Sequence, residues 1–275
     1  MTHQIIGLAQ AVTHTFGVRW QDQKDGHKSL SRAEECRNRL PSGLNVCDID
    51  YPLLVGLQTS LREDMAPSTV NRYMSAFSAV LRESHKMGWM SQMPQIPKLR
   101  EPDSKTRYLT PEEQASLFYE LELIDPRLHM LAMVLVDTGL RVSEALSLRR
   151  EDVHKDRVTV QATKSGKART VPLTSWAKRS LKKALETNGG RPRVFHGITE
   201  NTLGHAWRAA RASAHIGTDV TVHTLRHTCA SRLVQRGVSL AVVQRWLGHG
   251  SINTTMRYAH LGDEEVMRAV EVLEN

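Results

Sequence analysis

The sequence lacks the features that mark a secreted protein, a zinc protein or a membrane protein. Its 275 residues contain only three cysteines, which are scattered, odd in number and without a C-x-x-C pair: Cys36, Cys47 and Cys229. This pattern argues against a disulfide framework or a zinc site and fits a reducing cytosol. No run approaches ~18 consecutive apolar residues, and residues 1–10 show no basic lead into an apolar segment. We therefore expect neither a membrane span nor a signal peptide.

Two kinds of catalytic equipment are also missing. No G-x-x-x-x-G-K-S/T loop for a nucleotide phosphate is present, which fits a reaction that needs no ATP. In the second half of the chain, five histidines lie outside the fragments discussed below: His154, His196, His205, His215 and His260. They lack the spacing of metal ligands and have no acidic neighbours that could complete a metal site. We therefore expect no metal site and no cofactor.

The chain does carry an excess of positive charge. Its formal net charge is +8 and its isoelectric point is near 9.6, so it should attract polyanions, of which DNA is the commonest. The excess is concentrated between Lys155 and Arg193, where eleven Lys or Arg residues accompany only Asp156 and Glu186. A solvated helix face followed by a loop would give the same pattern, so charge alone leaves both interpretations open.

Closely spaced prolines divide the chain into two predicted domains. Pro94, Pro97 and Pro102 lie among basic and polar residues, and this spacing prevents a helix and favours an extended, solvated connection over residues 93–106. We predict a helical domain over residues 1–100, a basic linker over 101–106 and a second domain over 107–275.

The first predicted domain is all helical. After Pro67, apolar residues recur at the spacing of one buried helix face: Val70, Tyr73, Met74, Phe77, Val80 and Leu81. Gly88 is expected to end this helix, and shorter helices are expected over residues 30–40 and 53–62.

The second predicted domain is mainly α with a small β-hairpin. Thr110, Pro111 and Glu113 form a strong helix start, since the threonine can cap and the glutamate can complete a capping box. The Val- and Thr-rich segments 157–163 and 169–173 predict a hairpin whose tip carries Lys164 and Lys167. Helical patterns cover residues 128–137, 141–148, 175–186, 200–214, 224–236, 240–247 and 252–259.

Five short fragments of the second domain contain residues suited to chemistry. They are residues 138–144, the hairpin lysine, and residues 223–227, 247–249 and 255–258. Singly, each has an ordinary structural explanation: a surface arginine, histidines that cap a helix or lie in the core, or a core tyrosine.

In this order, however, the fragments closely resemble the motif of the tyrosine site-specific recombinases of the phage integrase family. That motif is an arginine, a lysine on a β-hairpin, H-x-x-R, a histidine or tryptophan, and a nucleophilic tyrosine. The matching residues are Arg141, Lys164, His223, Arg226, His249 and Tyr258, with Glu144 at the acidic supporting position. Residues 68–72 and 88–89 are also similar to the core-binding domain of phage integrases, and the resemblance covers roughly residues 12–262.

The resemblance implies that Tyr258 attacks a phosphodiester to give a 3′-phosphotyrosyl link and a free 5′-hydroxyl. Without a metal, two guanidiniums must neutralise the pentacovalent phosphate, and Arg141 and Arg226 suit that role. The implied general acid is Lys164, although Lys167 lies only three residues away.

The implied roles of the histidines differ from those of the arginines. His223 could accept or share the tyrosine proton, because an imidazole titrates near neutral pH. His249 is expected to donate a hydrogen bond to the phosphate.

The resemblance further implies a two-domain clamp on duplex DNA. It implies a homotetramer that works through a Holliday-junction intermediate. The reaction would integrate or excise a mobile element in the cytoplasm and nucleoid of a bacterial host. A directionality factor or a DNA-bending protein is left open as a partner. Candidate DNA contacts, with ordinary solvated surface as the alternative, are Asn71, Arg72, Lys167 and Arg169.

Two other functions and two structural alternatives stay open at this point. A type IB topoisomerase would share the chemistry, but the core-binding sequence and His249 argue against it. A catalytically silent DNA-binding protein would share the scaffold, but retention of all six site residues argues against it.

The tail carries an apolar stripe that either closes its own core or docks on a neighbouring subunit. The resemblance favours docking, and the stripe consists of Val266, Ala269, Val270 and Leu273. Too few residues precede the resemblance for an arm-binding domain, so we expect a simpler recombinase or a truncated sequence.

Overall fold

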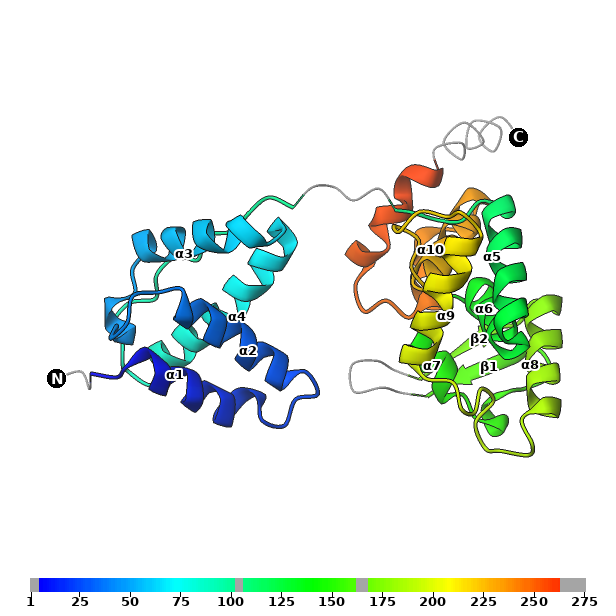
Figure 1. The fold of residues 1–275 in the computed structure, drawn as a ribbon, viewed down its shortest axis with the longest axis horizontal. Coiled ribbons are helices and arrows are strands. Elements are labelled where there is room, and N and C mark those ends of the chain that lie inside the picture. The colour runs from blue at the N-terminus through cyan, green and yellow to red at the C-terminus, as the bar shows by residue number, and fades with distance from the viewer. Residues whose placement is uncertain (1–4, 102–105, 162–167, 263–275) are drawn as a thin grey trace. The chain divides into compact units, whose positions relative to one another are not determined.

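The computed structural model describes residues 5–101, 106–161 and 168–262. The chain forms two compact units, Met1–Asp103 and Ser104–Asn275, called unit 1 and unit 2 below (Figure 1). Within the described ranges, every helix is too short or too polar to span a membrane.

Unit 1 is a set of helices packed around α4. Its elements are α1 (Leu8–Thr15), a π-helical stretch (Phe16–Trp20), α2 (Gly26–Asn38), a 3-10 turn (Val46–Asp48), α3 (Tyr51–Asp64) and α4 (Pro67–Lys86). The predicted buried face of α4 is confirmed, because Val70, Met74, Phe77, Val80 and Leu81 are all buried. Helices α1, α2 and α3 each contact α4, so its apolar face is the centre of the core.

The chain after α4 turns back along unit 1. Gly88 adopts a left-handed backbone (φ 73°) just beyond the end of α4, where the sequence predicts a stop. The following segment contributes Met93, Ile96 and Leu99 to the surface of the unit 1 core. The expectation of a solvated connection over residues 93–106 is therefore wrong for its first part, which is extended but packed.

Asn71 of α4 fixes this returning segment. Its side-chain amide accepts from the backbone N–H of Leu99 and donates to the Leu99 carbonyl, both at 2.9 Å, and also donates to Glu101 at 2.8 Å. An asparagine expected to face DNA is thus committed to holding the chain that leaves unit 1.

Replacement of Asn71 should destabilise unit 1. Asn71→Ala removes three hydrogen bonds, and we expect the free energy of unfolding to fall by about 1–3 kcal/mol. The matched control is Arg72→Ala on the exposed side of the same helix turn, which should change that energy by less than about 0.5 kcal/mol. Chemical denaturation of the full chain measures the free energy of unfolding of both variants. Equal losses in the two variants would contradict the role of Asn71 in holding the returning segment.

Unit 2 is built around the buried helix α6. Its helices are α5 (Pro111–Ile124), α6 (Pro126–Thr138), α7 (Val142–Ser147), α8 (Ser175–Thr187), α9 (Glu200–Ser213), α10 (Thr224–Gln235) and α11 (Leu240–Leu247). Helices α5, α8 and α10 surround and contact α6 (Figure 1). The residues of α6 are apolar almost all round. Strands β1 (Arg157–Val160) and β2 (Arg169–Pro172) form an antiparallel pair in which Val160 lies opposite Arg169. The predicted fold class, mainly α with a small β element, is confirmed.

Local signals at the helix ends explain most of these boundaries. Thr110 and Glu113 make the predicted capping box at the start of α5, with distances of 3.2 and 3.0 Å between side-chain oxygens and backbone nitrogens. Gly139 (φ 64°) ends α6 in the left-handed conformation, as the sequence suggests. The predicted hairpin tip, including Lys164 and Lys167, lies outside the described residues.

The predicted α-helix over residues 252–259 is wrong. The chain instead forms two 3-10 segments, Ile252–Thr254 and Met256–Gly262. Backbone N–H groups of Thr255 and Tyr258 each bond to the carbonyl three residues earlier. The β-branched pair Thr254-Thr255 disfavours a continuous α-helix, and the Thr255 hydroxyl is committed to the imidazole of His249 at 2.9 Å.

Candidate active site

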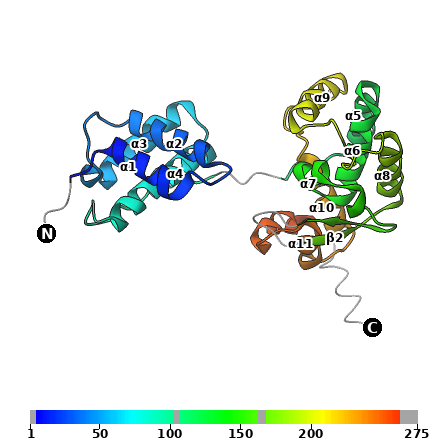
Figure 2. The ribbon, with the colours of Figure 1, turned by 90° about the horizontal axis from the view of Figure 1, so that it is seen from below.

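Four segments of unit 2 carry the described residues of the predicted site. Arg141 occupies the N-cap of α7, His223 and Arg226 begin α10, His249 follows α11, and Tyr258 lies in the second 3-10 segment. Helices α10 and α11 lie together next to β2 (Figure 2). Burial, and after it the positive charges of Arg226 and Arg141, lower the pKa of both His223 and His249, so these residues share one electrostatic environment.

The buried carboxylate of Glu144 binds two arginines. Its carboxylate accepts from the backbone N–H and a guanidinium nitrogen of Arg141, both at 2.9 Å, and from both terminal nitrogens of Arg169 at 2.9 and 2.7 Å. Burial alone would raise the pKa of Glu144, but these hydrogen bonds and charges lower it to about 2. Arg141 remains exposed, whereas the fork of Arg169, expected to contact DNA, is already occupied by the carboxylate.

Arg226 is buried and joins two helix ends. Its terminal nitrogens donate to the carbonyls of Gly139 and Leu247, at the C-termini of α6 and α11. Burial and the charge of Arg141 lower its pKa to about 10, so it stays protonated at neutral pH. The helix ends carry partial negative charge, which favours a cation at this position.

Glycine allows this close approach at two places. Gly139 and Gly248 both have left-handed backbones, with φ of 64° and 68°. A Cβ at residue 139 would lie 2.6 Å from a methyl carbon of Leu247, and one at residue 248 would lie 2.8 Å from Nε of Arg169. Any other residue would strain the left-handed backbone and displace the side chain of Leu247 or Arg169.

Tyr258 is buried, with 1% of its surface exposed, and its hydroxyl lies 2.6 Å from Nδ1 of His227. Burial raises the pKa of the phenol despite the nearby Arg257 and Arg226. His227 also meets His223 edge to face, with ring centroids 4.8 Å apart. The sequence places His227 in the fragment but assigns it no role; its spacing of four residues from His223, one helix turn, is the signal that was available.

The histidines of the site are held neutral. Burial, followed by neighbouring positive charges, lowers the pKa of His227 and of His249 to about 4. Arg257 acts on both and on His223, although sequence reasoning did not single it out. The site therefore has an exposed part, called the outer layer, that consists of Arg141, His223 and Arg257. Its buried part contains Arg226 and Tyr258.

Unit 1 offers a separate cationic surface. A hollow of about 310 Å³ is bordered by four arginines of the first helices and α4: Arg19, Arg32, Arg72 and Arg82. The sequence predicts only Arg72 as a DNA contact; the other three arginines join it through the packing of the helices, which no local spacing reveals.

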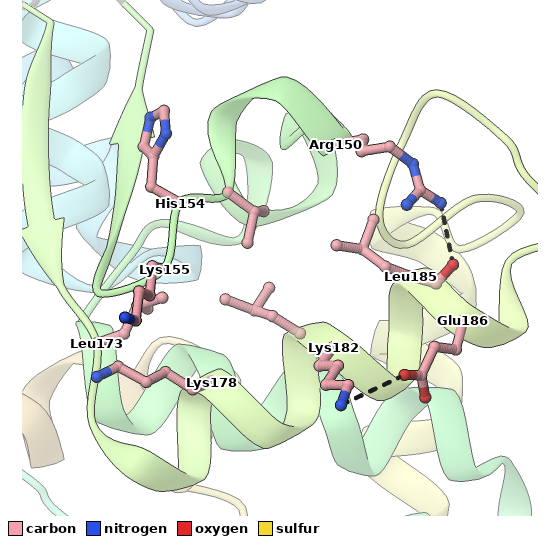
Figure 3. Close-up of a pocket in the computed structure, with 10 residues that line it drawn as sticks. Arg150, His154, Lys155, Leu173, Lys178, Lys182, Leu185 and Glu186 are labelled. Atoms are coloured by element: carbon pink, nitrogen blue, oxygen red, sulfur yellow. Dashed lines mark hydrogen bonds and ion pairs between the residues drawn. The ribbon is translucent and has the colours of Figure 1, made fainter.

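A larger hollow in unit 2, of about 460 Å³, lies away from this site (Figure 3). Leu173 lines it with Leu181 and Leu185 of α8, and Lys178 and Lys182 border it. Leu173 follows the strand end at which Pro172 pairs with Arg157, whereas Arg169 at the opposite end reaches Glu144. None of the described residues of the predicted site lines this hollow.

Removal of the Glu144 charge should destabilise unit 2. Glu144→Gln leaves the poorly exposed Arg169 without a counter-charge, and we expect a loss of about 3 kcal/mol in the free energy of unfolding. In the matched control, Glu151→Gln, the ion pair with Arg149 is exposed and the loss should stay below about 1 kcal/mol.

The same substitution has a pH signature. Because the folded-state pKa of Glu144 lies near 2 and its ordinary value is 4.5, its contribution is complete above pH 4.5 and is lost as pH falls toward 2. The wild type should therefore lose its advantage over Glu144→Gln on acidification. A constant difference between the two from pH 6 to pH 3 in chemical denaturation would argue against this anchor.

Comparison with known proteins places this arrangement in a family. Residues 107–265 match the phage integrase family. The integrase of Escherichia phage 186 is 32% identical over 216 residues, which span 76% of this chain and 61% of that integrase. The tyrosine recombinase XerD of Lacticaseibacillus casei is 30% identical over 239 residues, which span 79% of this chain and 80% of that protein.

Solved structures show the same fold. A lambda integrase dimer bound to a COC′ core site superimposes with a TM-score of 0.78 at 19% identity and covers 93% of this chain and 78% of that one. The Tn1549 transposon integrase in complex with a circular intermediate DNA gives a TM-score of 0.78 at 15% identity, covering 96% and 99%. By sequence and by fold, this chain belongs to the phage integrase family of tyrosine recombinases.

Proposed function

We propose that this tyrosine recombinase cuts and rejoins duplex DNA at specific sites through a 3′-phosphotyrosyl link on Tyr258. The observation that carries the proposal is the placement of the phenol beside a buried, charged Arg226 and the exposed Arg257. A phenol is a weak nucleophile at its ordinary pKa, and adjacent cations favour its phenolate. The phosphodiester energy is kept in the tyrosyl ester, so rejoining needs no ATP.

The arginines supply electrostatic stabilisation in this proposal. Arg141 and Arg226 bind the non-bridging oxygens of the pentacovalent phosphate, supported from below by Glu144 and by the two helix ends. Removing one such donor costs roughly 2.7–4 kcal/mol, or ~10²–10³ in rate, in comparable oxyanion sites. His249 donates a hydrogen bond to the same phosphate, His223 faces it from the outer layer, and Lys164 protonates the leaving 5′ oxygen.

Unit 1 contributes affinity in this proposal. Its four-arginine hollow binds backbone phosphates, and the two units together clamp the duplex. Lambda integrase, which has this fold, has been solved as a tetramer bound to a Holliday junction. We extend that assembly to this chain: a homotetramer that exchanges strands between two duplexes, integrates or excises a mobile element and acts in the bacterial cytoplasm.

The covalent step can be tested on a randomised pool of nicked duplexes. The nick releases the 5′ fragment and traps the enzyme on DNA, and sequencing the trapped DNA identifies the site. We expect the wild type to form the adduct, Tyr258→Phe to form none, and the control Tyr119→Phe, altered on the exposed face of α5, to match the wild type. An adduct that survives Tyr258→Phe would refute the assignment of the nucleophile.

A second assay tests strand exchange. Incubation with two labelled duplexes carrying the selected site should give recombinant products and a resolvable four-way junction. Relaxation of supercoiled DNA without any recombinant product would instead identify a nicking-closing enzyme and overturn the recombinase function.

The hollow of unit 1 makes a prediction about salt. Arg72→Ala and Arg82→Ala should each weaken binding to any DNA sequence and reduce the slope of log affinity against log salt by ~0.9. Arg62→Ala, an exposed arginine of α3 outside the hollow, should leave that slope unchanged. If all three variants keep the wild-type slope, the hollow makes no phosphate contact.

A further inference from the structure

The nucleophile of this chain is hydrogen-bonded to a histidine outside the motif. Nδ1 of His227 lies 2.6 Å from the Tyr258 hydroxyl, and their ring centroids are 5.9 Å apart. His223, the motif histidine, is exposed at the start of α10 and meets His227 through a ring contact. The nearest basic nitrogen to the phenolic proton therefore belongs to His227.

The protonation states of the two groups allow the phenol to donate this hydrogen bond. The buried phenol keeps its proton, because burial raises its pKa. His227 is neutral and can offer one ring nitrogen as an acceptor. The phenol donates to Nδ1 in the tautomer that carries the imidazole proton on the second ring nitrogen, and this is the form that can accept the phenolic proton.

We propose that His227 accepts the phenolic proton when Tyr258 attacks DNA, and returns it when the strand is rejoined; this rests on the function proposed above. In cleavage, the Oη–H bond of Tyr258 breaks and an N–H bond forms at Nδ1 of His227. The Oη–P bond forms as the P–O5′ bond breaks, and the 5′ oxygen takes a proton from the general acid, assigned to Lys164. Rejoining reverses each transfer, so protons and charge balance over the cycle.

The surroundings of His227 make this transfer depend on DNA. The groups that face it are all cationic or neutral: His223 and Arg226 from α10, His249 after α11, and Arg257 beside the tyrosine. Their charges oppose a proton on His227 in the free protein. A bound phosphodiester cancels part of that repulsion, so His227 becomes a stronger base only when the substrate is in place.

The test compares His227→Asn with His223→Asn in single-turnover cleavage of a nicked duplex carrying the selected site. The asparagine oxygen can replace Nδ1 as a hydrogen-bond acceptor but cannot take a proton. We expect His227→Asn to bind DNA with wild-type affinity and to cleave ~10²–10⁴-fold more slowly. Its rate should rise tenfold per pH unit toward the pKa of the phenol, whereas the wild-type rate levels off at lower pH.

A substrate with a 5′-bridging sulfur locates the defect within the reaction. A thiolate leaves without a general acid, so this substrate should restore cleavage to Lys164→Ala but not to His227→Asn. Thermal unfolding of each variant separates misfolding from chemistry, and His227→Gln provides a second variant if His227→Asn does not fold.

Three outcomes would overturn the assignment of His227. They are a wild-type rate and pH profile in His227→Asn, restoration of that variant by the sulfur substrate, and the altered pH profile appearing only in His223→Asn. Each leaves the function standing, because the Tyr258 adduct would still form; loss of that adduct in the wild type would instead refute the proposed function.

Discussion

Arg226 holds together the parts of unit 2 on which the site depends. Its two hydrogen bonds tie the end of α6 and the end of α11 to the first turn of α10, and each tied segment carries a further member of the site. Arg141 follows the first helix end by two residues, and His249 follows the second. A buried guanidinium is costly unless every donor finds an acceptor, so the cation that would stabilise a phosphate also enforces the geometry around it.

The cluster carries more positive than negative charge, and Glu144 limits the resulting repulsion. Its carboxylate forms ion pairs with both Arg141 and Arg169 and supplies negative charge to this cluster. One carboxylate among Arg141, Arg169, Arg226 and Arg257 leaves this group of described residues with a net positive charge in the free protein. This excess positive charge can attract a phosphate anion, and it is the basis of the proposed link between DNA binding and the protonation of His227.

The sequence predicts much of this arrangement because its signals are local. The capping box at Thr110, the helix stop at Gly88 and the periodic face of α4 depend on neighbouring residues, and the structure confirms each one. Helix α1 escaped prediction because its buried face spans only eight residues between glycines. The 3-10 segments at 252–262 depend on the contact of Thr255 with His249, which no local pattern reveals.

The same distinction separates the predicted and the unpredicted parts of the site. Motif order identifies candidate residues, but it cannot say which partner each side chain meets. Arg169 is predicted as a DNA contact, yet its partner is a carboxylate 25 residues away in sequence. Asn71 contacts the returning chain 28 residues later, and His227 meets a tyrosine 31 residues later. Such pairings arise from tertiary packing, which a single sequence does not display.

The displaced pKa values of the cluster have a consequence for how the free protein responds to acidity. Glu144 titrates near 2, His227 and His249 near 4, and Arg226 near 10, while the pKa of Tyr258 is raised and that of His223 is lowered. Near pH 7 Glu144 is therefore ionised, His227 and His249 are neutral and Arg226 is protonated. Small changes of pH around neutrality therefore leave the charge of these four groups, and with it their attraction for a phosphate anion, nearly unchanged.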